Sequence, residues 1–88
     1  MNNLRSKAIS LGASDLQQSN RQYKKYAVMY NDKWIHFGDS RYEDFTIHKD
    51  VERRQAYRAR ASKIKNIQGQ LTYKLKSAPN YWAYHLLW

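Results

Sequence analysis

Two short apolar segments with a tight turn between them constrain the fold of this chain more than any other feature. Residues 26–30 and 33–37 contain aromatic and aliphatic side chains in the pattern of β-strands. Asn31 and Asp32, which lie between them, tolerate the left-handed backbone conformation that a two-residue turn requires. The pattern therefore predicts a β-hairpin.

The length of the turn fixes the register of this hairpin and the residues that face its core. A two-residue loop places Met29 opposite Trp34 and Val28 opposite Ile35. Both faces of the hairpin then carry apolar side chains, so we expect both to be at least partly covered. With aromatic residues from later in the chain, the predicted core consists of Tyr26, Val28, Trp34, Ile35, Phe37, Tyr57 and Trp82.

A basic helix is predicted after the hairpin. Asp50 is a favourable N-cap residue, and residues 51–64 are rich in the helix formers Glu, Arg, Ala and Gln. Gly69 marks the break after the helix. The cations of this segment fall on several faces of the predicted helix and form a candidate surface for a polyanion or a partner protein: Arg53, Arg54, Arg58, Arg60, Lys63 and Lys65.

The two ends of the chain differ in character. Residues 1–22 are rich in Asn, Ser and Gln and poor in aliphatic side chains, so we expect an extended arm. Residues 71–75 alternate in the manner of a third strand. The apolar residues 81–88 are expected to fold back onto the core, because a small core needs their area, and docking on a partner is the alternative.

The length of 88 residues allows one small domain. The expected fold class is α+β: a β-hairpin, with three strands if residues 71–75 join it, packed with the basic helix, plus the N-terminal arm. The expected division is an extended arm over residues 1–22 and a compact domain over residues 23–88. No apolar run approaches the roughly 20 residues that a transmembrane helix needs, so no transmembrane segment is expected.

The charge is large and unevenly distributed. The chain has sixteen Lys and Arg against seven Asp and Glu, a formal net charge of +9. Residues 23–50 are balanced, whereas residues 51–88 carry eight basic side chains and one acidic one. This asymmetry indicates a surface for polyanions, although a solvated helix face that maintains solubility is an equal alternative.

No catalytic site, metal site or cofactor is expected. Cysteine is absent, which excludes disulfides and Cys-ligated metal sites. No glycine-rich phosphate loop is present. Five His and Asp side chains lie within fifteen residues, but their spacing matches no ligand pattern, and capping or ion pairing explains them as well: His36, Asp39, Asp44, His48 and Asp50. The protein is therefore not expected to be an enzyme.

The segment from Ile35 to Lys63-Ile64 resembles a family of small basic proteins of unknown function that large eukaryotic DNA viruses and related aquatic viruses encode. The pattern that carries the likeness reads H-F-G-D, then R-Y-x-D-F-T-x-H-x-D, over residues 36–50. The ending from Leu71-Thr72-Tyr73 to Leu86-Leu87-Trp88 is similar too. The resemblance implies a viral origin and a compact α+β unit, and it assigns no active site.

Two functions are consistent with these features. The first is a virion structural protein, a minor capsid or cement component that bridges larger coat subunits and faces either the coat or the packaged genome. Its expected partners are other virion proteins, above all the major capsid protein, and its expected location is the virion, after assembly in the host nucleus or cytoplasm. The alternative is a nucleic-acid-binding protein that condenses or escorts viral DNA through the basic helix, without sequence preference.

Overall fold

The central hairpin has the register that its turn predicts. In the computed structural model, which describes residues 2–88, β2 (Lys24–Tyr30) pairs antiparallel with β3 (Lys33–Asp39). Met29 lies opposite Trp34 and Val28 opposite Ile35. The two turn residues have φ values of 52° and 64°, as a tight hairpin of this type requires.

The N-terminal residues form regular structure, so the expectation of an extended arm over residues 1–22 is wrong. They form helix α1 (Asn2–Ser10) and strand β1 (Asp15–Gln18). Strand β1 pairs antiparallel with β2 and places Leu16 opposite Val28, which gives a three-stranded sheet of order β1-β2-β3. The expected boundary at residue 22 therefore falls inside one sheet.

The physical reason is a sparse but helical spacing of apolar residues in this segment. Leu4, Ala8 and Leu11 recur at intervals of four and three, so Leu11, which directly follows α1, continues the face that Leu4 and Ala8 form on the helix. Ala8 is fully buried, and Leu4 and Leu11 pack against the core. The polar residues Ser6 and Ser10 fall between these positions and conceal the short stripe in the composition.

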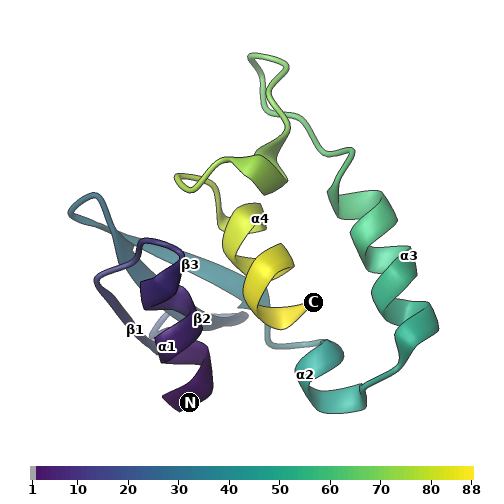
Figure 1. Cartoon of the computed structure of the whole chain (residues 1–88), viewed down its shortest axis with the longest axis horizontal. Coiled ribbons are helices and arrows are strands. Elements are labelled where there is room, and N and C mark those ends of the chain that lie inside the picture. The colour runs from purple at the N-terminus through teal and green to yellow at the C-terminus, as the bar shows by residue number, and fades with distance from the viewer. Residues whose placement is uncertain (1) are drawn as a thin grey trace.

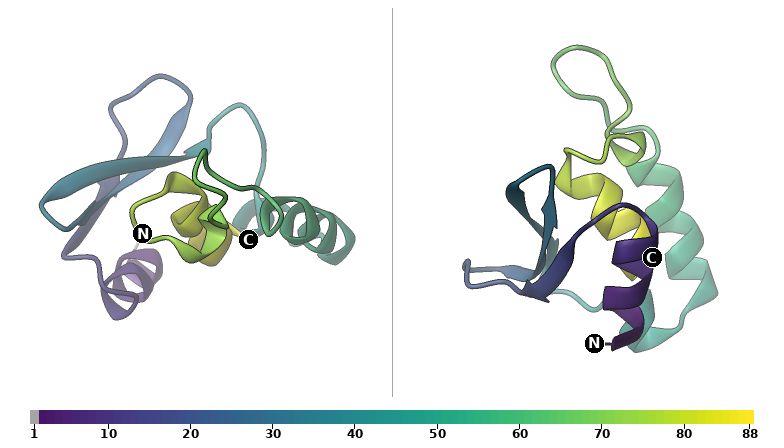
Figure 2. Two further views of the ribbon diagram at one scale, coloured as in Figure 1. Left: turned by 90° about the horizontal axis from the view of Figure 1, so that it is seen from above. Right: turned by 60° about the vertical axis from the view of Figure 1, so that its left-hand side comes forward.

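The remaining elements are short helical segments that lie to one side of the sheet. They are α2 (Phe45–His48), α3 (Val51–Ala61), the 3-10 turn η1 (Thr72–Lys74), α4 (Pro79–Trp82) and the π-helical segment η2 (Ala83–Leu87). Figure 1 shows α4 and the C-terminus between the sheet and α3. Figure 2 shows that α1 and α4 lie against the same face of the sheet, with α3 farther out. The protein is thus a small α+β domain.

The core lies between the sheet and the C-terminal helical segment. Its largest fully buried side chains are Trp82, Phe37, Leu87 and Val28. Leu86 is also buried, and Tyr26 and Trp88 pack against the cluster. Residues 81–88 therefore fold back onto the sheet.

Trp34 does not belong to this core. Trp34 is 40% exposed, because it alternates along β3 with the buried Ile35 and Phe37 and therefore lies on the sheet face away from the core. Within residues 2–88 no helix packs on that face (Figure 2), and its cover is partial, as expected: Ala27 is buried there, whereas Trp34 is exposed.

The segment at residues 71–75 does not join the sheet. It forms only an isolated bridge between Leu71 and Lys65, followed by η1. Strand β1 occupies the free edge of β2 instead, and the 62–70 loop carries the chain away from the sheet (Figure 1).

Two aspartates set the starts of α2 and α3. The Asp50 carboxylate accepts hydrogen bonds from the backbone N–H groups of Glu52 and Arg53, as predicted for an N-cap. Asp44 caps α2 by accepting from the N–H of Thr46. Helix α3 ends at Ala61, three residues earlier than predicted.

Among residues 2–88, no helix is both long and apolar enough to cross a bilayer.

Candidate functional site

The arginines of α3 face the rest of the molecule. Arg53, Tyr57 and Arg60 recur at intervals of four and three, so they share one stripe of the helix. Arg54 and Arg58 lie on the neighbouring stripe, next to buried Ala61. The outward stripe is almost free of cations and consists of Val51, Glu52, Gln55 and Ala59. The cations of α3 thus occupy more than one face of the helix, as expected, and leave the stripe of Val51, Gln55 and Ala59 without a cation.

Two of these arginines have structural partners. The Nε of Arg54 donates a hydrogen bond to the carbonyl oxygen of Trp88 at 2.7 Å, and its guanidinium lies 4.8 Å from the ring centre of Phe45. The guanidinium of Arg58 lies 4.6 Å from the ring centre of Tyr84. These contacts attach α3 to α2 and to the C-terminal segment, so neither side chain is a free cation for a ligand.

The other four predicted cations divide into two groups. Arg53 and Arg60 are exposed and line a groove between α3 and the sheet. Lys63 and Lys65 are also exposed, but they follow α3 in the 62–70 loop and do not line it.

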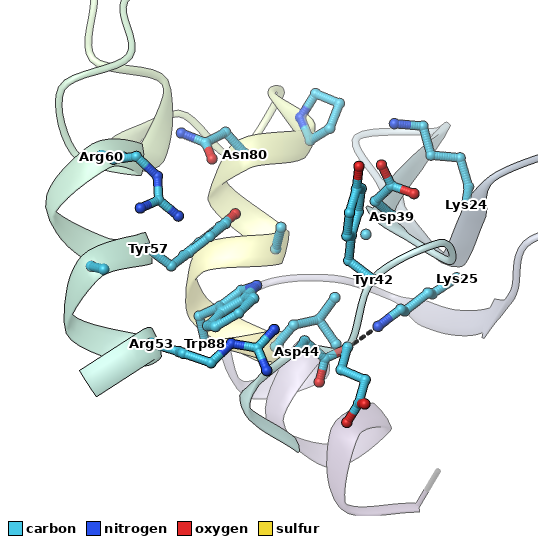
Figure 3. Close-up of a pocket in the computed structure, with 16 residues that line it drawn as sticks. Lys24, Lys25, Asp39, Tyr42, Asp44, Arg53, Tyr57, Arg60, Asn80 and Trp88 are labelled. Atoms are coloured by element: carbon cyan, nitrogen blue, oxygen red, sulfur yellow. Dashed lines mark hydrogen bonds and ion pairs between the residues drawn. The ribbon is translucent and has the colours of Figure 1, made fainter. Parts of the chain in front are cut away.

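The groove has a volume of about 570 Å³. This size falls within the roughly 300–1,000 Å³ that is typical of ligand pockets. Its lining comes from the start of β2, the β3–α2 connection, α3 and the C-terminal segment: Lys24, Lys25, Gly38, Asp39, Tyr42, Glu43, Asp44, Arg53, Ala56, Tyr57, Arg60, Pro79, Asn80, Ala83, Leu87 and Trp88. Figure 3 shows these side chains.

Aromatic rings form two walls of the groove. The ring of Tyr57 stacks on that of Trp88, with centroids 4.3 Å apart and planes 10° from parallel. Burial raises the pKa of Tyr57, so its phenol stays neutral at physiological pH. Tyr42 lies across the groove from this pair (Figure 3) and is 67% exposed. The groove therefore presents flat apolar surfaces that are open to a ligand.

The acidic residues of the groove are largely neutralised. The carboxylate of Asp44 is buried and lies 2.5 Å from the Nζ of Lys25. Asp39 accepts two hydrogen bonds from the Arg41 side chain, at 2.9 and 3.0 Å, and these hold its pKa at about 2. Glu43 is exposed and forms no ion pair within residues 2–88.

Three cations around the groove have no carboxylate partner. Within residues 2–88, the ion pairs join Arg5 to Asp15, Lys25 to Asp44 and Arg41 to Asp39. Lys24, Arg53 and Arg60 therefore remain unpaired and exposed at the groove. A polar and cationic rim around aromatic walls favours a ligand that is both flat and anionic.

The histidines and aspartates that are close in sequence do not form one site. No group of three or more metal-ligating side chains is present within the described part of the chain. Asp50 and Asp44 cap helices. His36 is half-buried on the sheet face opposite the core, where the Oγ of Ser19 is 2.6 Å from its Nδ1. Burial, followed by the charges of Arg21 and Lys24, lowers the pKa of His36.

Sequence reasoning missed much of the groove. It did not single out Lys24, Tyr42, Asn80 or Trp88 as binding residues, because they come from segments that only the tertiary fold brings together. One signal was present in the sequence: Tyr57 shares a helical stripe with Arg53 and Arg60.

The fold and groove define a small α+β domain with one aromatic and cationic cleft. The chain belongs to the family of unknown function DUF5754, whose model matches residues 14–61, more than half of the chain. The chain matches no curated protein and no solved structure. The family match covers the sheet, α2 and α3, and the segment from Ser62 onward lies outside it.

Proposed function

We propose that the protein binds nucleic acid without sequence specificity, through the groove between α3 and the sheet. The observation that carries this proposal is the inward direction of Arg53 and Arg60, which join Lys24 at the groove with no carboxylate partner among residues 2–88. Arginine suits phosphate because its planar guanidinium forms paired hydrogen bonds with phosphate oxygens.

The charge of the whole chain supports the same proposal. A net charge of +9 attracts polyanions over the range of the Debye length, and each phosphate that a cation neutralises releases counterions. Contacts of these cations with the phosphate backbone account for the expected lack of sequence preference, because such contacts carry no sequence information.

The test is binding of the purified chain to random duplex and single-stranded DNA between about 50 and 200 mM salt. We expect affinity to fall steeply with salt. The double substitution Arg53→Gln and Arg60→Gln should weaken binding about tenfold at physiological salt, because it removes groove cations. The control is the double substitution Lys63→Gln and Lys65→Gln, which removes two positive charges outside the groove. It should weaken DNA binding less than threefold, because it lowers only the general positive potential of the protein.

Two outcomes contradict this proposal. Absence of binding even at low salt would exclude nucleic acid as the partner. Equal losses in the two double variants would mean that the general positive charge, and not the groove, determines binding.

The second candidate is a virion structural component of viral origin, in contact with larger coat proteins such as the major capsid protein. The supporting observation is a set of exposed aliphatic side chains: Ile47, Val51, Ile64 and Ile67. Because residues 2–18 contribute to the folded domain, an arm that extends over neighbouring subunits no longer supports this candidate. Mass spectrometry of purified virus particles tests it, since a structural component must be present in the particle at a reproducible copy number, and absence from the particle excludes it.

A further inference from the structure

We infer that the groove receives an unpaired nucleobase that carries a phosphate, so that the protein engages single-stranded nucleic acid or a free nucleotide in preference to a duplex. This inference rests on the proposed function and specifies the ligand of the same groove. Its basis is the placement of aromatic rings and unpaired cations within one cavity of about 570 Å³.

The aromatic rings provide the surface for the base. Tyr42 and the Tyr57–Trp88 stack come from opposite sides of the groove (Figure 3), with Ala83 and Leu87 also in its lining. A base that enters between them meets aromatic and apolar surface. Each of the four bases can stack on an aromatic side chain, because every base has a π-face. A base within a duplex has both faces covered by its neighbours, so only an unpaired base can enter in this way.

The cations provide the sites for the phosphate. Figure 3 shows Arg53 and Arg60 on the α3 side of the groove and Lys24 on the opposite side, beside Asp39. Asp44 is already paired with Lys25. Asp39 is likewise engaged by Arg41, so the cations without an ion-pair partner among residues 2–88, Arg60, Arg53 and Lys24, are the expected contacts of the phosphate.

Asn80 supplies a polar group for the edge of the base. Its amide nitrogen donates hydrogen bonds to the carbonyl oxygen of Ala61 at 3.0 Å and to the hydroxyl of Thr72 at 2.9 Å. These bonds fix the side chain and leave its carbonyl oxygen without a donor among residues 2–88. Because bases carry N–H donors on their edges, this oxygen is positioned to accept from the ligand.

A methylated ammonium group would also fit aromatic walls, but the charges oppose it. Lys24, Lys25, Arg53 and Arg60 line the groove, and two of its three carboxylates are engaged by Lys25 and Arg41. Like charges destabilise a bound cation, whereas the same surroundings favour an anion.

The test compares three ligands of about 12 nucleotides on the full chain: single-stranded DNA, an abasic strand with the same phosphates, and a duplex. We expect the single strand to bind about tenfold more tightly than the other two. Tyr42→Ala should remove this advantage while leaving the weaker binding to the abasic strand unchanged. Tyr42 is largely exposed, so the variant should fold, which circular dichroism checks. The control is Trp34→Ala, which removes an exposed aromatic ring outside the groove and should retain the advantage.

A mononucleotide distinguishes the two sources of the ligand. If the mononucleotide binds as tightly as the single strand, and if Tyr42→Ala weakens this binding, the ligand is a free nucleotide. If the single strand binds more tightly than the mononucleotide, the ligand is single-stranded nucleic acid. Equal affinity for the intact and abasic strands overturns the base site but leaves the proposed function intact. Mononucleotide binding without binding of any strand supports the base site and overturns the proposed function. Absence of binding to all four ligands overturns both.

Discussion

The rings of Tyr57 and Trp88 are stacked with centroids 4.3 Å apart, although 31 residues separate them along the chain. The ring of His48 lies 5.2 Å from that of Trp88, and Arg54 binds the Trp88 carbonyl. Trp88 thus joins α2, α3 and the C-terminal segment. Because the family match ends at residue 61, one aromatic wall of the groove depends on a residue outside the matched region.

Leu16 tests whether the N-terminal segment belongs to the folded domain. Leu16→Ala should lower the free energy of unfolding by about 2–5 kcal/mol, because the side chain is 2% exposed and lies opposite Val28 in the sheet. The neighbouring Gln17→Ala changes an exposed side chain and should alter stability by no more than about 0.5 kcal/mol. Urea denaturation measures both. Similar, small effects for the two variants would mean that β1 contributes little to the fold.

Two tryptophans should differ sharply in their contributions to stability. Trp82 is fully buried, so Trp82→Ala should cost about 3–5 kcal/mol and leave little folded protein. Trp34 lies on the sheet face away from the core, so Trp34→Ala should cost only about 1 kcal/mol, the size of a cross-strand contact with Met29. Thermal denaturation followed by circular dichroism makes the comparison. A large loss for Trp34→Ala would indicate that another molecule or copy covers that face.

The local features of the fold were the most predictable from sequence. The hairpin register follows from the two-residue turn and the alternation around Val28 and Ile35, and the start of α3 follows from the capping carboxylate of Asp50. Both depend on interactions between residues that are close along the chain. The fold-back of residues 81–88 follows from their apolar character, because an 88-residue chain has few other ways to complete a core.

The groove was not predictable in the same way. Lys24 and Arg60 are far apart in sequence and lie at one cavity only because the C-terminal segment separates α3 from the sheet. Trp34 was misplaced because alternation assigns residues to two faces of a strand without identifying the face that other elements cover. The position of β1 was missed because its four residues contain a single aliphatic side chain.

The buried ion pair between Lys25 and Asp44 should be costly to break. Their side chains are 13% and 4% exposed, and Asp44 also accepts hydrogen bonds from the backbone and hydroxyl of Thr46. Asp44→Asn leaves the Lys25 ammonium without its counter-charge and should cost about 3 kcal/mol. Adding Lys25→Met should restore part of this loss, and a double-mutant cycle in urea measures the coupling. Additive losses would show that the two charges do not interact appreciably.

Acidification should destabilise the protein through His85. Burial, with smaller effects of Arg58 and Lys7, lowers the pKa of His85 below its ordinary value of 6.5, although a hydrogen bond to the Tyr73 carbonyl opposes the shift. The unfolded chain therefore binds more protons than the folded one below about pH 6.5, and stability falls as the pH decreases through this range. Melting temperatures between about pH 5 and 8 should show this decline, and His85→Gln should reduce its slope. A melting temperature that rises on acidification contradicts this account.

Gly38 should be the least replaceable glycine, because it allows the C-terminal segment to approach the sheet beside the groove. Its φ is +80°, and a Cβ there would lie 2.7 Å from the Cδ1 of Leu87. Gly69 has nearly the same φ, +81°, but nothing lies within 4 Å of its Cβ position. Gly69→Ala should therefore cost about 1–2 kcal/mol for the left-handed backbone alone. Gly38→Ala adds a steric overlap in the core and should cost at least about 1 kcal/mol more. Urea denaturation of the two variants separates backbone strain from packing, and equal losses would mean that Leu87 moves aside without penalty.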